Sequence, residues 1–272
     1  MSSSLKSLAK LQLLVLSSGL IAVTFTMLGC QKEVPAAFNT VDAGDAKAAT
    51  AKIAEADQLY EAREDMARAR VAVATLRQAV MGDYGNYEAA WKLSRASFYV
   101  GDHADSGDEA DQSFTSGIEA GKAAIKLQPD KPDGHFWLGA NYGGEAERST
   151  LPSLAAVTNI RTEMETVIKL DEKFLGGSAY LGLGKLYLKA PSVLGGSTTK
   201  AVENLKKGLA ISPGNALMKY YLAEAHESDG RDADARKELD EVLKSTPDPK
   251  FVAEHKDAVK KANKLLEKLN RK

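Results

Sequence analysis

Residues 135–142 read HFWLGANY, and the spacing of this segment returns twice further along the chain. Each copy puts a long side chain, an apolar residue, a small residue and a second large side chain on one helical face. The three copies are His135-x-x-Leu138-Gly139-x-x-Tyr142, Tyr180-x-x-Leu183-Gly184-x-x-Tyr187 and Lys219-x-x-Leu222-Ala223-x-x-His226. A small residue lets a second helix approach closely, and the large side chain fills the space beside it. The pattern therefore predicts packed pairs of helices, and its residues are typical of packing, not of catalysis.

A second helical signature follows each copy, with a spacing of four and then three residues. Its members are Ile160, Met164 and Val167, then Ala201, Leu205 and Gly208, then Ala235, Leu239 and Val242. Pro213 and Pro247 follow the last two of these helices and stand 34 residues apart, which is the period of a helix-turn-helix solenoid unit. The pairing resembles the tetratricopeptide repeat (TPR). We therefore expect an all-α, TPR-like solenoid of helical hairpins.

The remaining segments fit the same plan. Residues 48–80 have apolar positions at helical spacing and form a degenerate first repeat, and residues 87–100 and 108–127 form another pair. Gly117 and Gly121 lie inside the last of these helices, where each costs about 1 kcal/mol against alanine. This indicates close helix packing there, or a ligand near the backbone, with packing the favoured alternative. We assign residues 48–248 to the repeat domain and the amphipathic residues 249–272 to a helix that caps the final repeat.

The first thirty residues are typical of a targeting segment. Lys6 and Lys10 precede an apolar run, and the sequence Met27-Leu28-Gly29-Cys30 resembles a bacterial lipobox, in which the cysteine is lipidated and becomes the N-terminus. We expect a signal peptide over residues 1–29, lipid on Cys30 and a flexible tether over 30–47; an uncleaved signal anchor is the alternative. From these features we expect the protein in the cell envelope, facing the periplasm. Gln31 favours the outer membrane if the source is Gram-negative.

Composition and residue spacing argue against several classes of function. The net charge of -1 with 27% charged residues suggests no nucleic-acid partner. The four histidines are far apart in the sequence and lack the spacing of a metal site, and no pattern of a nucleophile with its base is found. Residues 195–200 read GGSTTK but lack the spacing of a phosphate-binding loop, so we expect Ser197 to cap the next helix. We predict no catalytic residues, no metal and no cofactor.

Part of the chain is similar to a particular family of TPR proteins, the T-component of tripartite (TRAP) transporters. The similarity is carried by Trp91-x-Leu93-x-Arg95-Ala96, by residues 135–143 and by Pro191-x-x-Leu194-Gly195-Gly196-Ser197. The layout is also similar to that of the eukaryotic regulator-of-microtubule-dynamics proteins, but the lipobox favours the bacterial family. This resemblance implies association with a periplasmic solute-binding protein and binding of a small hydrophobic or acidic ligand.

Two functions remain open from the sequence. One is an accessory to a TRAP-type transporter; the other is a general envelope adaptor or assembly factor that binds peptide segments of other proteins and is unrelated to transport. In both, a partner would bind the groove that the first helices line. Transfer of the TPR groove positions selects Phe136, Leu181, Lys185, Lys189, Tyr220 and Glu224, with the two lysines placed to hold a carboxylate. An ordinary solvated helix face is the competing interpretation of these positions.

Overall fold

The computed structural model describes residues 43–150 and 152–271, which hold eleven α-helices and no strand. The prediction of an all-α fold is confirmed. Within these two stretches, no helix combines the length and the apolar character that a membrane span needs. The predicted signal peptide, Cys30 and most of the predicted tether lie outside the described residues.

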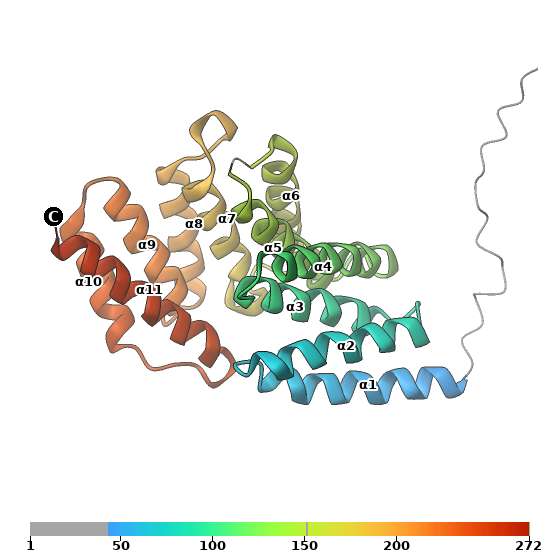
Figure 1. Cartoon of the computed structure of the whole chain (residues 1–272). Coiled ribbons are helices and arrows are strands. Elements are labelled where there is room, and N and C mark those ends of the chain that lie inside the picture. The colour runs from blue at the N-terminus through green and yellow to red at the C-terminus, as the bar shows by residue number, and fades with distance from the viewer. Residues whose placement is uncertain (1–42, 151, 272) are drawn as a thin grey trace, which may run out of the picture. The chain divides into compact units, whose positions relative to one another are not determined.

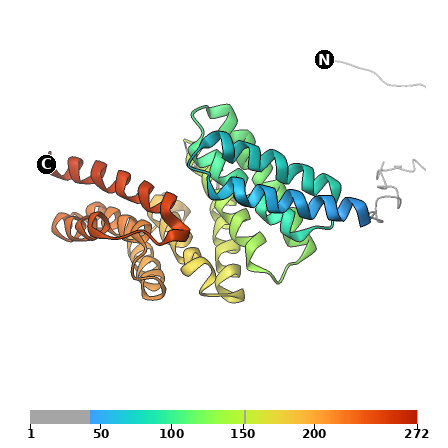
Figure 2. The same cartoon turned by 90° about the horizontal axis from the view of Figure 1, so that it is seen from below.

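Ten of the described helices form five successive hairpins, and the eleventh follows the last one (Figure 1). The hairpins are α1 (Ala43–Glu61) with α2 (Met66–Gly82), α3 (Tyr87–His103) with α4 (Gly107–Leu127), α5 (Pro132–Arg148) with α6 (Leu154–Leu170), α7 (Ser178–Lys189) with α8 (Thr198–Ile211), and α9 (Ala216–Ser228) with α10 (Asp232–Lys244). The last helix is α11 (Val252–Asn270). Figure 2 shows the same succession of hairpins from below. The predicted hairpin solenoid with a C-terminal helix is thus confirmed.

Two element boundaries differ from the predicted ones. Helix α1 begins at Ala43, inside the segment expected to be a tether, because residues 43–51 are rich in alanine, the strongest helix former. Ala49 and Ile53 of this helix are buried in one apolar cluster with residues of α2 and α3. At the other end, α11 begins at Val252 after a short 3-10 turn over Pro249–Phe251. The absence of large apolar side chains before Ala48 had suggested a linker, but alanines suffice for this helix.

The turn before α8 confirms the structural interpretation of residues 195–200. Ser197 is the N-cap of α8, and its side-chain oxygen accepts a hydrogen bond from the backbone N–H of Lys200 at 3.3 Å. Gly195 has a φ of 95°, a conformation that glycine adopts readily and other residues rarely. The chain therefore uses these residues to turn sharply and start a helix.

The small residues of the repeated motif lie where the two helices of a hairpin touch. A Cβ atom on Gly139 would be 2.6 Å from Met164 of α6, and one on Gly184 would be 2.6 Å from Cγ of Leu205 of α8. Ala223 of the third copy is fully buried. Both distances are shorter than those of real Cβ contacts. A side chain at position 184 would displace the fully buried Leu205, and one at position 139 would displace the flexible end of Met164.

The glycines inside α4 allow the same kind of approach between hairpins. A Cβ on Gly117 would lie 2.0 Å from Oδ1 of the fully buried Asn141, and one on Gly121 would lie 2.9 Å from Cβ of Leu138. Asn141 is held in place because its Nδ2 donates hydrogen bonds to the carbonyl oxygens of Trp137 and Ser94, at 2.7 and 3.0 Å. Close packing, the favoured alternative for these glycines, is confirmed.

We predict that Gly184→Leu lowers the free energy of unfolding by about 1 to 3 kcal/mol, because the new side chain would overlap buried Leu205. Gly143→Leu is the matched control. Gly143 is also inside a helix, but nothing lies within 4 Å of its Cβ position, and leucine is the better helix former. Urea unfolding of both variants provides the measurement. Equal stability of the two variants would contradict the packing described here.

A second prediction concerns His135, whose ring joins α5 to α6. Its Nδ1 is 2.6 Å from Glu163 and its Nε2 is 2.9 Å from the carbonyl oxygen of Pro129. The hydrogen bond with Glu163 raises the pKa of His135 despite burial, which opposes the rise. A raised pKa adds stability below the ordinary histidine value of about 6.5, and this stability is lost as the pH rises through the raised pKa.

The melting temperature of the wild type should therefore exceed that of His135→Gln most at pH 6, and the difference should shrink by pH 9. Other titrating groups remain in both proteins, so the difference isolates His135. A constant difference over this pH range would show that the imidazole does not titrate in this way.

Candidate functional site

The first helices of the hairpins surround a cavity of about 990 Å³. Helices α1, α3, α5, α7 and α9 contribute to its wall, together with part of α6. The linker residues 246–249 and the N-terminal part of α11 complete the wall. In a TPR-like solenoid the first helices face the inner side of the stack, so the cavity occupies the place of the expected groove.

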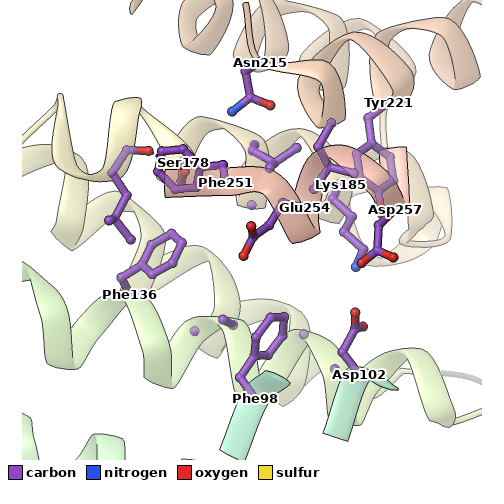
Figure 3. A pocket seen from close by; sticks show the side chains of 18 of the residues that line it. Phe98, Asp102, Phe136, Ser178, Lys185, Asn215, Tyr221, Phe251, Glu254 and Asp257 are labelled. Atoms are coloured by element: carbon purple, nitrogen blue, oxygen red, sulfur yellow. Dashed lines mark hydrogen bonds between the residues drawn. The ribbon is translucent and has the colours of Figure 1, made fainter. Parts of the chain in front are cut away.

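Aromatic and aliphatic side chains form one part of the cavity wall (Figure 3). Phe98 of α3 and Phe136 of α5 both pack against Trp137, with ring centroids 5.9 and 4.9 Å away. Leu181 of α7 and Phe251, which precedes α11, extend this surface. Such a lining favours an apolar molecule, because burial of apolar surface is the main driving force for small-molecule binding.

Charged groups gather in another part of the wall, around Lys185 (Figure 3). The Nζ atom of Lys185 is 2.6 Å from a carboxylate oxygen of Glu147 and 5.8 Å from the ring centroid of Tyr221. Burial alone would lower the pKa of Lys185, but Tyr221, Glu147 and Asp102 together raise it above the ordinary lysine value. Lys185 is therefore a permanent cation at neutral pH, and its charge is already matched by a carboxylate of the chain.

Asp102 and His103 of α3 meet Asp257 of α11 beside this cation. Their potential ligand atoms lie within 4.8 Å of one another. Both ring nitrogens of His103 are engaged, with Nε2 2.9 Å from Asp257 and Nδ1 2.9 Å from the carbonyl oxygen of Tyr99. Burial would lower the pKa of His103, but these two hydrogen bonds raise it. The hydrogen bond with His103 lowers the pKa of Asp257. This arrangement is an ion pair between two helices, with no ring nitrogen left for a metal.

Four of the six predicted groove residues line the cavity: Phe136, Leu181, Lys185 and Lys189. The other two, Tyr220 and Glu224, are not part of its wall. Glu224 instead pairs with Lys189, as Glu147 does with Lys185. Each lysine predicted to hold a partner's carboxylate therefore already holds one of the chain's own, and reversal of both charges would break two internal ion pairs.

Several cavity residues were not selected from the sequence: Phe98, Asp102, Trp137, Tyr221 and Phe251. A signal for some of them exists in the spacing, because residues four apart share a helical face. Phe98 and Asp102 form one such pair, as do Leu181 and Lys185. The prediction selected Tyr220, but its neighbour Tyr221 lines the cavity. The predicted position is thus one residue away from the observed one. No spacing within α11 indicates that its N-terminal part faces the groove.

Solved structures of similar fold include TPR proteins of low sequence identity. TTC0263, described as a thermophilic TPR protein of Thermus thermophilus, is 19% identical, with a TM-score of 0.58 over 78% of this chain and 99% of that one. PilF of Pseudomonas aeruginosa is 14% identical, with a TM-score of 0.54 over 83% of this chain and 93% of that one. No curated protein matches the sequence. These likenesses support the fold alone.

A family model identifies the chain more closely. The model described as TRAP transporter T-component matches residues 95–271. The match is more than half of the chain, and it includes residues 135–143 and 191–197, which carried the resemblance in the sequence. It also includes α5, α7, α9 and α11, and with them most of the cavity wall. The chain belongs to the TRAP transporter T-component family.

Proposed function

We propose that this protein is a lipid-anchored accessory of a TRAP-type transporter in the bacterial cell envelope. It holds an apolar solute in its cavity and engages a periplasmic solute-binding protein. The observation that carries the proposal is the cavity itself, which lies on the inner side of the solenoid and is completed by α11. Membership of the T-component family supports the connection to transport.

The size and lining of the cavity fit a small molecule. Pockets for small ligands are typically about 300 to 1,000 Å³ in volume and mostly apolar, with a few polar groups that fix orientation. The cavity is at the upper end of that range, at about 990 Å³. Its aromatic part would hold the apolar body of a solute, while Lys185 and Asp102 would orient a polar group. Because Lys185 is paired with Glu147, a neutral head group suits this end better than a second carboxylate.

The alternative function, an adaptor for extended peptide segments, fits the cavity less well. A peptide that binds along a solenoid needs a continuous groove across several repeats. Here α11 and residues 246–249 form part of the wall around that inner surface. The partner protein would therefore contact an outer or end surface of the solenoid and exchange solute with the cavity.

Replacement of Gly143 by a large residue tests solute binding. Gly143 lines the cavity, and its Cβ position has no neighbour within 4 Å. Gly143→Trp should fill part of the cavity and weaken binding of the uncharged dye 1-N-phenylnaphthylamine about tenfold or more, by displacing ligand volume. Dye fluorescence titrations provide the measurement, and Gly143→Ala is the matched control. Equal affinity of the two variants would contradict binding in this cavity.

The connection to transport has a separate test. Capture with the wild-type protein from an envelope extract should retain a TRAP-type solute-binding protein. Consistent retention of other envelope proteins in its place would favour the adaptor function.

The lipid anchor gives a further prediction. Cys30→Ser should move the protein from the membrane fraction to the soluble fraction, or leave it as an unprocessed precursor, because the lipid can no longer be attached. Fractionation and the mass of the mature chain provide the measurement. Retention in the membrane with the mass of the complete chain, in both the variant and the wild type, would instead support the uncleaved signal anchor.

A further inference from the structure

The two halves of α11 are attached to the protein in different ways. In the C-terminal half, Ala262, Leu265 and Leu269 are buried in one apolar cluster with Leu239 and Val242 of α10. At the end of the helix, Arg236 of α10 donates a hydrogen bond to the side chain of Asn270 at 2.6 Å. Exposure of several buried apolar side chains to water has a large unfavourable free energy. The C-terminal half is thus a fixed anchor, as the predicted capping role requires.

The N-terminal part of α11, residues 252–257, makes mainly polar contacts with the turn between α1 and α2 and with the end of α3. One small apolar residue, Ala253, joins the core of the first hairpins. Three ion pairs also attach it: Arg63 with Glu254 at 2.9 Å, Glu64 with Lys256 at 2.6 Å, and His103 with Asp257 at 2.9 Å. The side chains of Glu254 and Lys256 are 38% and 64% exposed. The Glu64–Lys256 pair is exposed on both sides and contributes little net stability. Arg63 is 11% exposed and contacts both carboxylate oxygens of Glu254, so this pair is the stronger of the two.

The same part of α11 belongs to the cavity wall. Phe251, Glu254 and Asp257 line the cavity, as do the linker residues 246–249 (Figure 3). His255 connects helix and linker, because its Nε2 is 3.0 Å from the hydroxyl of Ser245. Displacement of residues 252–257 would therefore move the linker as well and widen the cavity on that side.

We propose that residues 245–257 form a strap that opens to admit solute to the cavity and closes over it, while the rest of α11 stays anchored. This inference rests on the proposed solute binding and adds its regulation. Segments held by few apolar contacts open locally at a lower free energy than the core. Among the strap side chains that the structure describes, Ala253 is the one that is buried, whereas the anchor buries Ala262, Leu265 and Leu269 in one apolar cluster. Opening therefore occurs at the strap. Lids of this kind set the rate at which many ligands enter and leave.

Chemical crosslinking at the strap provides the test. The full-length chain with Cys30→Ser has no thiol, because Cys30 is its one cysteine. In this background, Glu64→Cys with Lys256→Cys would be joined by a short bis-maleimide. Arg236→Cys with Asn270→Cys, joined in the same way, ties down the anchor instead and is the matched control. The strap crosslink should slow association of 1-N-phenylnaphthylamine about tenfold or more, and the control crosslink should leave it within about twofold.

Hydrogen exchange of α11 measures opening without any ligand. Amides of residues 256–260 should exchange faster than those of residues 263–269 in the uncrosslinked protein, and the strap crosslink should remove the difference.

Glu254→Arg should speed both exchange and dye association, and the swap Arg63→Glu with Glu254→Arg should reverse the effect. Dye association that is unchanged by the strap crosslink overturns the proposal. Absence of dye binding in the wild type would count against solute binding, and exchange would then decide alone whether the strap opens.

Discussion

The arrangement of this protein depends on a steric constraint: three hairpins have a small residue, Gly139, Gly184 or Ala223, where their two helices touch. Gly139 against Met164 and Gly184 against Leu205 set the spacing within two hairpins. Gly117 against Asn141 sets the spacing between α4 and α5. Because protein interiors are packed as densely as organic crystals, a few such contacts fix how each hairpin stacks on the next. The inner surface that the first helices create follows from this stacking.

Helix α11 adds one further wall to that inner surface. An open solenoid presents its first helices to large partners, whereas here the last helix packs on α9 and α10 and its N-terminal part contacts Arg63 and His103. The same side chains therefore have two roles. Glu254 and Asp257 join distant parts of the chain, and they also supply charge to the cavity wall. The selectivity of the cavity and the attachment of α11 are physically coupled through them.

The repeat architecture could be predicted from sequence because it depends on local spacing. The spacing within residues 135–142 and their two copies predicts which face of each helix packs. The TPR period predicts which helices pair into hairpins. The site was only partly predictable. Phe136, Leu181, Lys185 and Lys189 were found because groove positions recur in each repeat. The ion pairs of Lys185 with Glu147 and of Lys189 with Glu224 could not be predicted. A helical period does not indicate which acidic residue on another helix a long side chain will reach.

The contacts at the N-terminal part of α11 were also beyond the sequence pattern. Its apolar stripe predicts packing on the last repeat, which is correct, but an ion pair such as Arg63 with Glu254 joins residues 191 positions apart. The spacing of residues along a helix does not predict a contact between residues so far apart in the sequence. Two local details also differ from the prediction, one helix boundary and one cavity-lining residue. Residues 43–51 have no large apolar side chain, so the start of α1 was predicted too late in the chain. The groove positions selected Tyr220, whereas its neighbour Tyr221 lines the cavity.

The contact between α11 and the first hairpins has a consequence for how the chain folds. In an open array of repeats, each unit contacts its neighbours alone, so the terminal units fray first and stability grows nearly in proportion to length. Here Ala253 is buried in the core of the first hairpins while Leu269 of the same helix is buried with the last. The two ends of the array thus share one helix. While the strap is closed, fraying at either end therefore disturbs the other, and the array has the long-range cooperativity of a globular domain at the expense of slower folding. Opening of the strap would separate the two ends again.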